Sequence, residues 1–300
     1  MSLSALGRAM RPHQWVKNVF VLAALIFRLG ELGDPTEHLG LVGRVLLAFF
    51  AFCCGASAIY LVNDCLDAET DRRHPTKRTR PIAAGELSIH AALVAAGCLM
   101  LSALALAWVA SSESGSVVIT VAGYMALQLL YSLKLKHVVI LDAFVIASGF
   151  LLRVLAGGYA AQAPLSHWLV LCTLFLALFL ALCKRRAEID LLGDDRGEHR
   201  KILLEYTPEF LDQTVVVLAA CAIVSYTMYT VDPGTVKKFS SGEALIWTVP
   251  FVVFGLFRYL LLVRTQRGGG SPTRVLLGGD GAFLANALAW LTVVIVALFF

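Results

Sequence analysis

Residues 41–81, LVGRVLLAFFAFCCGASAIYLVNDCLDAETDRRHPTKRTRP, join a long apolar run to a short, highly charged segment. The run from 41 to 62 contains one charged residue, Arg44. As an α-helix it is long enough to cross the ~30 Å hydrocarbon core of a bilayer. The segment from 63 to 81 carries four carboxylates followed by five basic residues. This stretch therefore predicts a membrane-spanning helix with a charged site at its end.

The rest of the chain repeats the apolar pattern. Of its 300 residues, 58% are hydrophobic and 15% are charged, whereas about a quarter of the residues in a soluble domain are charged. Nine apolar stretches, each of roughly 16 to 24 residues, are long enough to span a membrane; they cover 15–30, 41–63, 88–110, 116–133, 138–156, 165–183, 213–231, 244–263 and 282–300. We therefore predict an all-α polytopic membrane protein with nine transmembrane helices, in a single domain of residues 1–300.

The distribution of basic residues predicts an orientation in the membrane. Most of the 25 Lys and Arg residues lie in the N-terminal segment or in the connections that follow even-numbered helices. Because cytoplasmic loops carry the excess of Lys and Arg, we expect a plasma-membrane protein with a cytoplasmic N-terminus and an external C-terminus. The net charge of +4 follows from this topology, and it gives no reason to expect a nucleic-acid partner.

Two of the predicted cytoplasmic connections, 64–87 and 184–212, are long and charged. Each follows an apolar span and places carboxylates beside a cluster of Lys and Arg. They are four helices apart, which indicates a faint internal repeat of about four helices. We expect the two loops to meet over one central cavity.

The acidic half of the first loop has helical spacing. If the helix continues past Asn63, then Asp64, Asp67 and Asp71 lie within about 60° of one another, and Glu69 points away. Carboxylates on one stripe repel each other unless a cation lies between them. Because Mg²⁺ prefers oxygen ligands and retains waters that a diphosphate can replace, we predict that the three aspartates bind Mg²⁺.

The basic half of the loop predicts the partner of that metal. His74 and Pro75 are expected to end the helix, so that Lys77, Arg78 and Arg80 fold back over the carboxylates. Their side chains would then bind phosphate oxygens that the metal leaves free. Together the two halves predict a Mg²⁺-diphosphate site. The alternative is a solvated loop whose cations only set the membrane topology.

The pattern NDxxDxxxD, from Asn63 to Asp71, resembles the first aspartate-rich motif of the UbiA superfamily of intramembrane prenyltransferases. The segment YSLKLK, residues 131–136, resembles the YSxxLK signature of the same superfamily. The resemblance covers nearly the whole chain. It implies nine helices around a central cavity that opens to the membrane.

Other segments resemble one branch of that superfamily, the decaprenyl-phosphate phosphoribosyltransferases; they are RPHQWVKN (11–18), GFLLRVLAGG (149–158), KRRAE (184–188) and HRKILLEYTPEFLDQ (199–213). This resemblance implies Mg²⁺-dependent transfer of 5-phosphoribose from phosphoribosyl diphosphate to polyprenyl (decaprenyl) phosphate, with release of diphosphate. The product would lead to a lipid-linked arabinose donor for the cell wall. The alternative within the superfamily is a prenyltransferase that uses prenyl diphosphate and an aromatic or other lipid acceptor.

The second charged loop departs from the usual prenyltransferase pattern. Those enzymes carry a second aspartate-rich motif there, whereas this chain has Lys184, Arg185 and Glu188. The two cations suit an extra anion, such as a sugar phosphate or the lipid phosphate, unless they serve topology alone. Asp190 and Asp194 have DxxxD spacing, which leaves a second metal open.

Further candidate substrate ligands lie within or beside the apolar spans. Asp142 and Arg153 are eleven residues apart, so a helix places them on one face. We expect Asp142 to bind a ribose hydroxyl or the metal shell, and Arg153 either to bind an anion in the cavity or to snorkel to the interface. Tyr131 and Lys136 are expected to border the donor site, with interfacial anchoring as the alternative. The remaining candidates are Asn63 and, reaching the cavity from the first helix, Lys17 and Asn18.

Two functions from other classes compete with the transferase. A transporter would place its charges at mid-span in broken helices, whereas these carboxylates lie at predicted helix ends. A non-catalytic scaffold would tolerate loss of Asp64 and Asp67. The sequence is also compatible with a homo-oligomer.

Overall fold

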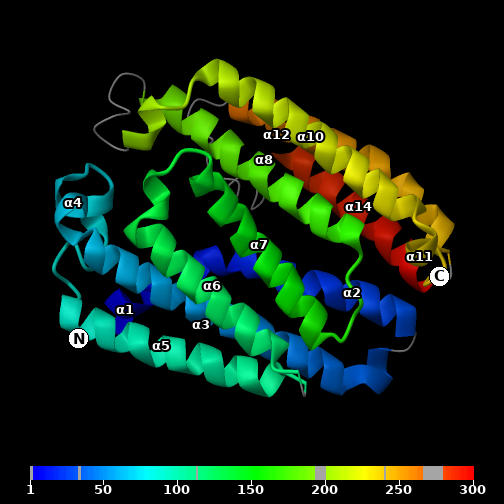
Figure 1. Ribbon diagram of the computed structural model, residues 1–300, viewed down its shortest axis with the longest axis horizontal. Helices are drawn as coiled ribbons and strands as arrows, with labels where there is room; N and C mark the ends of the chain where they lie inside the picture. Colours follow the sequence, from blue (N-terminus) through cyan, green and yellow to red (C-terminus); the bar gives the residue numbers. More distant parts are fainter. Residues whose placement is uncertain (1–2, 33–34, 113, 193–200, 240, 266–279) are drawn as a thin grey trace. The chain divides into compact units, whose positions relative to one another are not determined.

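Long α-helices joined by short turns and 3-10 helices make up the described part of the chain (Figure 1). The computed structural model describes residues 3–32, 35–112, 114–192, 201–239, 241–265 and 280–300. No strand occurs in these ranges. The predicted all-α fold is therefore confirmed.

Eight helical segments among the described residues are long and apolar enough to cross a membrane. They are α3 (Leu39–Leu66), α5 (Ile89–Ala110), α6 (Ser116–Leu133), α7 (Leu141–Ala160), α8 (His167–Leu192), α10 (Pro208–Val231), η7 with α12 (Gly242–Thr265) and α14 (Gly281–Phe299). Each corresponds to one of the predicted stretches. The chain is therefore a multi-pass membrane protein.

At the predicted first span, 15–30, the observed α-helix is shorter than the sequence indicated. The 3-10 helix η1 (Pro12–Val19) occupies its first part, and α2 (Phe20–Leu32) follows with 13 residues. At ~1.5 Å per residue, α2 alone reaches about two thirds of the hydrocarbon thickness. The described residues therefore contain eight spans of full length and not nine. Shorter elements complete them: α1 (Leu3–Ala9), η2 (Pro35–His38), α4 (Ala68–Arg73), η3 (Lys77–Thr79), η4 (Leu135–His137), η6 (Lys201–Leu204) and α11 (Pro233–Val236).

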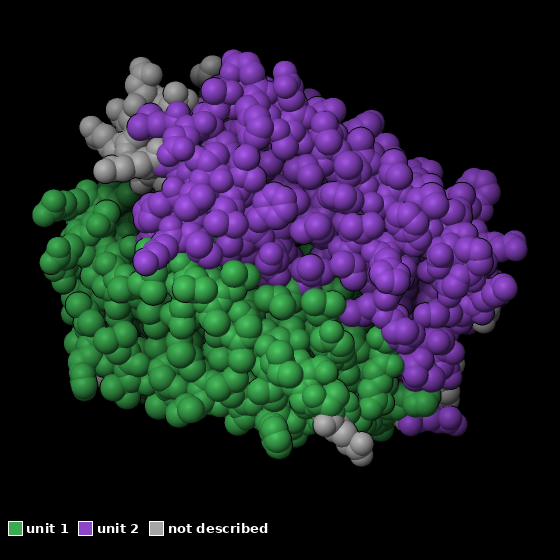
Figure 2. Space-filling view, in the orientation of Figure 1, with its two compact units in different colours: residues 1–25, 38–133, 152–163 green, residues 26–37, 134–151, 164–300 purple. Residues whose placement is uncertain are grey.

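The chain divides into two compact units (Figure 2). Unit 1 comprises residues 1–25, 38–133 and 152–163, and unit 2 comprises 26–37, 134–151 and 164–300. Helices α2 and α7 each begin in one unit and end in the other. The single domain predicted from the sequence stays a prediction.

Unit 1 is built on α3, the most buried of the eight spans. Helix α5 packs along α3 through alanines that recur at helical spacing; they are Ala92, Ala96, Ala103 and Ala107, each at most 2% exposed. Small side chains let two helix backbones approach closely in a membrane. On its other face α5 exposes Leu101 and Trp108, as expected of a lipid-facing surface.

One glycine in unit 1 fixes how α7 meets α2. A Cβ atom on Gly157 would lie 2.0 Å from the carbonyl oxygen of Val21. No side chain fits at that distance, so the two backbones are in direct contact. This contact lies one turn from Arg153 on α7 and close in sequence to Asn18 at the end of η1.

Unit 2 is organised around α8, α10, α12 and α14, and side chains cap the starts of α10 and α14. Helix α10 begins with Pro208 after Thr207, whose hydroxyl accepts the amide of Phe210 at 3.2 Å. Asp280 caps α14 by accepting the amide of Phe283 at 2.7 Å, and it also binds Arg258 of α12. Such caps satisfy the unpaired amides at helix starts.

Candidate functional site

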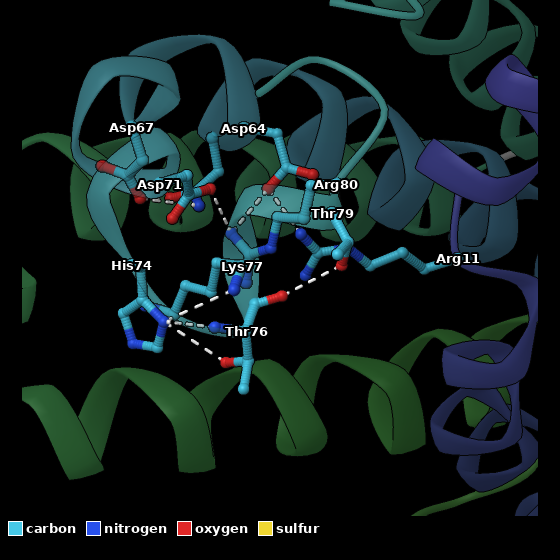
Figure 3. Close-up of polar contacts among 10 residues, drawn as sticks. Arg11, Asp64, Asp67, Asp71, His74, Thr76, Lys77, Thr79 and Arg80 are labelled. Carbon is cyan, nitrogen blue, oxygen red and sulfur yellow. Dashed lines mark hydrogen bonds and ion pairs between the residues drawn. The ribbon is translucent and has the colours of Figure 1, made fainter. Parts of the chain in front are cut away.

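Two buried carboxylates meet one arginine at the end of α3 (Figure 3). Arg80 donates through Nη1 to Asp64 Oδ1 at 3.1 Å and to Asp71 Oδ2 at 2.7 Å. Asp64 and Asp71 are each 2% exposed. The helical spacing predicted for these two aspartates therefore places them around one cationic nitrogen.

The backbone around Asp67 explains why the stripe persists although α3 ends at Leu66. The amide of Asp67 donates to the carbonyl of Asn63 at 2.9 Å, and the amide of Asp71 donates to the carbonyl of Asp67 at 2.8 Å. Helical hydrogen bonding thus continues from α3 into α4, and Asp71 remains two turns from Asp64. Glu69 is exposed, as its predicted angle requires.

Asp67, the third predicted metal ligand, binds a neighbouring side chain in this arrangement. Its Oδ2 accepts Nδ2 of Asn63 at 3.0 Å. Among the residues that the structure describes, no three Asp, Glu, His or Cys side chains lie close enough together to hold a metal ion. At this site Arg80 Nη1 is hydrogen-bonded to both Asp64 and Asp71, and Asp67 is paired with Asn63 instead.

The turn after α4 returns the chain to the carboxylates. Helix α4 ends at Arg73, and His74 is extended at φ −82° and ψ 133°, as the residue before Pro75 should be. Nδ1 of His74 accepts the amides of Thr76 at 3.2 Å and of Lys77 at 3.4 Å, which holds the start of η3 (Figure 3). The predicted fold-back therefore occurs.

Of the three cations predicted to cover the site, Arg80 reaches the carboxylates in the described structure. Lys77 is partly exposed and Arg78 is exposed. Arg80 itself remains 25% exposed at its side chain. The loop therefore presents cations both on the acidic pair and beside it.

Sequence reasoning missed a fourth member of this group, Arg11. Its guanidinium hydrogen-bonds Asp64 and lies 4.9 Å from the ring centroid of Tyr60. Its backbone is in the left-handed region, at φ 53°. The two residues are 53 positions apart, so no spacing rule links them. We call Asp64, Asp71, Arg80 and Arg11 the Arg80 cluster.

A second polar group in unit 1 surrounds Arg153. Nε donates to Asn18 Oδ1 at 2.7 Å, and Nη2 donates to the Tyr124 hydroxyl at 2.9 Å. The guanidinium carbon lies 5.5 Å from the Phe52 ring centroid. Arg153 is 6% exposed, so it does not snorkel, and the structure brings it together with the predicted ligand Asn18. Lys17 precedes Asn18 in η1 and is partly buried.

In unit 2, three buried side chains form what we call the Asp142 clasp: Asp142, Arg185 and Tyr206. Arg185 Nε donates to Asp142 Oδ2 at 2.8 Å, and the Tyr206 hydroxyl donates to Asp142 Oδ1 at 2.7 Å. All three residues are at most 1% exposed. Two predicted substrate ligands, Asp142 and Arg185, are therefore each other's partners.

Tyr206 also holds the backbone where α7 begins. Its hydroxyl accepts the amide of Ile140 at 2.7 Å, and Ile140 has φ 67°, which is strained for a β-branched residue. Burial, together with the hydrogen bond to Asp142, raises the pKa of Tyr206 well above its ordinary value. The phenol therefore stays protonated and keeps donating to Asp142. Sequence reasoning missed this residue, although it lies inside the segment 199–213.

Two other predicted ligands of unit 2, Glu188 and Lys184, lie at the edge of the clasp. Arg185 Nη1 donates to Glu188 Oε2 at 2.7 Å, and Lys184 Nζ lies 3.8 Å from Glu188 Oε1. Lys136 is partly buried in η4. Tyr131, in contrast, belongs to α6 in unit 1. Asp190 and Asp194 were the possible ligands of a second metal ion. Asp190 forms an ion pair with Arg186, and Asp194 lies outside the described residues.

The sequence profile of the UbiA prenyltransferase family matches residues 18–286. The chain belongs to the UbiA prenyltransferase family. Among curated relatives, the decaprenyl-phosphate phosphoribosyltransferase of Corynebacterium glutamicum is 39% identical over 292 residues, covering 97% of this chain and 86% of the relative. The Mycolicibacterium smegmatis protein of the same name is 36% identical over 306 residues, covering 99% and 93%. The family resemblance inferred from the sequence is thereby confirmed.

Solved structures of the family share the fold. A UbiA homolog from Archaeoglobus fulgidus bound to GPP and Mg²⁺ matches with a TM-score of 0.72 at 15% identity, over 98% of this chain and 99% of that chain. A structure described as digeranylgeranylglyceryl phosphate synthase matches with a TM-score of 0.63 at 16% identity, over 99% and 96%. At these identities the matches establish the fold alone.

Proposed function

We propose that this UbiA-family enzyme transfers 5-phosphoribose from phosphoribosyl diphosphate to a polyprenyl phosphate, with decaprenyl phosphate as the acceptor. The observation that carries the proposal is the pair of buried carboxylates, Asp64 and Asp71, gathered on one cationic nitrogen at a helix end. Identity of 36–39% over nearly the whole chain with curated phosphoribosyltransferases supports the choice of donor and acceptor.

The donor set of the Arg80 cluster suits a divalent cation. Asp64 and Asp71 offer carboxylate oxygens around one cation position, and Asp67 lies within the same two turns. These are the hard oxygen ligands that Mg²⁺ prefers. We therefore propose that the three aspartates hold Mg²⁺, which, when bound, neutralises charge on the departing diphosphate.

The chemistry breaks one bond and forms another at C1 of the ribose. The bond from C1 to the diphosphate oxygen breaks, and its electron pair leaves with the diphosphate. A phosphate oxygen of the lipid then forms the new bond to C1. Because that oxygen is already anionic at neutral pH, no general base is needed. The protein has to align the two substrates and stabilise the leaving group.

The basic side chains of unit 1 supply that stabilisation in this proposal. Lys77 and Arg78 lie in the same turn as Arg80. Lys77 is partly exposed and Arg78 is exposed, so we propose that they bind phosphate oxygens as charge-assisted donors. Asn18 and Arg153 form a buried polar pair, which we assign to substrate contact together with Lys17 and Tyr131. Lys136, which belongs to unit 2, is proposed as a substrate ligand separately.

For unit 2 the contacts support a different division of roles. Asp142 and Arg185 satisfy each other in a sealed environment, so we propose that they support the fold and do not bind substrate. Lys184, with 46% of its side chain exposed, remains the candidate for an additional anion, with Glu188 beside it. We further propose a plasma-membrane location with the charged loops cytoplasmic, where the product would serve synthesis of a lipid-linked arabinose donor for the cell wall.

A donor-competition experiment tests this function. Membranes containing the protein receive polyprenyl phosphate, Mg²⁺ and either phosphoribosyl diphosphate labelled in the ribose or labelled prenyl diphosphate. We expect label in the lipid extract only from the ribose donor, and on the order of 10²- to 10³-fold less with Asp64→Asn. Label that enters lipid only from prenyl diphosphate would instead identify a prenyltransferase.

A further inference from the structure

The two arginines of the Arg80 cluster bind the carboxylates in different ways. Arg80 bridges Asp64 and Asp71 through a single nitrogen. Arg11 binds Asp64, and its guanidinium also lies over the Tyr60 ring. A cation–aromatic contact adds a second attachment that does not depend on the carboxylate. Arg11 is therefore anchored at two points, whereas Arg80 depends on the acidic pair.

Arg80 occupies the position that a divalent ion requires. Arg11 and Arg80 both bind Asp64 Oδ1, and Arg80 Nη1 alone also binds Asp71 Oδ2. A divalent ion held by both Asp64 and Asp71 would compete with Arg80 Nη1 for the space between the two carboxylates. Without a cation the two buried carboxylates would repel each other. Arg80 thus stabilises the acidic pair when no ion is bound, and it has to leave when one binds.

The local structure allows Arg80 to leave without a change of fold. Its backbone amide donates to the carbonyl of Lys77 at 2.9 Å, which fixes the main chain at the end of η3. Its side chain is 25% exposed, so it can rotate toward solvent or toward a bound anion. A diphosphate that arrives with the ion would offer Arg80 a new partner of suitable charge.

We propose that Arg80 is exchanged between the two carboxylates and the diphosphate of the donor, and that Arg11 is a positioning residue that stays on Asp64. The inference rests on the proposed function, because it assigns the order of events at the same site. Exchange couples the binding of the two ligands. A diphosphate that takes Arg80 away from the carboxylates makes binding of the ion more favourable. By linkage, a bound ion makes binding of the diphosphate more favourable to the same extent.

The test compares metal and diphosphate binding by purified full-length variants. Arg80→Gln removes the exchanging group. Arg73→Gln is the matched control, because Arg73 is an exposed cation on α4 that contacts neither carboxylate in the described structure. Mn²⁺ binding without diphosphate is measured by electron paramagnetic resonance. Binding of labelled pyrophosphate is measured separately in saturating Mg²⁺.

A crossed pattern is expected. Relative to Arg73→Gln, Arg80→Gln should bind Mn²⁺ about ten-fold more tightly in the absence of diphosphate, a coupling of typical size. In saturating Mg²⁺ it should bind pyrophosphate about ten-fold more weakly, because a charge-assisted hydrogen bond is lost. Arg11→Gln should show no gain in Mn²⁺ affinity over the control, and Arg11→Lys should bind Mn²⁺ as the unmodified protein does.

Each other pattern overturns the inference. If Arg80→Gln weakens both ligands, Arg80 is only structural, and if Mn²⁺ affinity matches the control, no exchange occurs. A gain in Mn²⁺ affinity for Arg11→Gln equal to that of Arg80→Gln would remove the distinction between the two arginines. Should Arg80→Gln fail to fold, Arg80→Lys, whose ammonium bridges two carboxylates less well, should give the same crossed pattern at smaller size.

This result can be separated from the proposed function. Ribose label that enters lipid with Mg²⁺ dependence, without the crossed pattern, would leave the function standing and remove the exchange. The crossed pattern in a protein that transfers only prenyl groups would support the exchange of Arg80 and contradict the proposed function.

Discussion

The Arg80 cluster of unit 1 and the Asp142 clasp of unit 2 are built from the same ingredients and differ in access to solvent. Each pairs an aspartate with an arginine close to a helix end, next to further basic residues. The Arg80 side chain is 25% exposed, whereas that of Arg185 is 1% exposed. An accessible guanidinium that is paired with a carboxylate can exchange one anion for another, but a guanidinium sealed against its carboxylate cannot. Exposure of the arginine therefore separates a candidate binding site from a structural ion pair.

The largest expected effect is loss of transfer when the acidic pair is broken. Asp64→Asn removes a charged oxygen ligand from the Arg80 cluster, so transfer of ribose label to lipid should fall by on the order of 10²- to 10³-fold. Glu69→Gln, an exposed carboxylate in the same segment, is the control and should retain activity. Equal loss in both variants would show that general charge, and not the stripe, matters.

Breaking the Asp142 clasp should lower the stability of the folded protein. Arg185→Ala leaves the buried carboxylate of Asp142 without its cation, and breaking such a pair costs roughly 3–5 kcal/mol. The double variant Arg185→Met with Asp142→Asn should recover part of this loss. Thermal denaturation in detergent measures both. If Arg185→Ala melts like the unmodified protein, the clasp does not support the fold.

The hydroxyl of Tyr206 should contribute less to stability than the pair of Asp142 and Arg185 does. Tyr206→Phe leaves Asp142 and the Ile140 amide each short of one partner, for a loss of about 1–3 kcal/mol. Because the folded pKa of Tyr206 lies above its ordinary value of 10.0, its contribution is complete below pH 10 and is lost as the pH rises through the folded value. Denaturation midpoints should therefore differ most below pH 10. Tyr159→Phe, at an exposed tyrosine, is the control.

Removal of divalent ions should have the smallest effect, which is a change in the melting temperature. In the unmodified protein Arg80 replaces the ion on the acidic pair, so a chelator should change the melting temperature little. Arg80→Gln lacks this replacement, and the chelator should lower its melting temperature by roughly 2–4 °C more. Arg185→Ala should respond to the chelator as the unmodified protein does. A larger response in the clasp variant than in Arg80→Gln would reverse the comparison.

Most of the fold could be predicted from the sequence because hydropathy and length determine which segments span a membrane. The first span differed because Arg11, in the left-handed region, and Pro12 start a 3-10 helix that takes residues away from α2. The proximity of Asp64 and Asp71 followed from helical periodicity, which acts over a few residues.

The partners of Asp64 and Asp142 that come from distant parts of the chain could not be predicted in the same way. Arg11 lies 53 residues from Asp64, and Tyr206 lies 64 residues from Asp142. Such pairs depend on how helices pack, and one sequence contains no periodic signal for that. The sequence therefore located the charges but could not distinguish an accessible ion pair from a sealed one.

A crystal structure with Mn²⁺ and pyrophosphate tests the central claim most directly, because anomalous scattering locates the ion. We predict an anomalous peak bonded to the carboxylates of Asp64 and Asp71, with the Arg80 side chain on the pyrophosphate oxygens and Arg11 still on Asp64. A structure in which Arg80 continues to bridge the two aspartates, while Mn²⁺ and pyrophosphate bind elsewhere, would contradict the account.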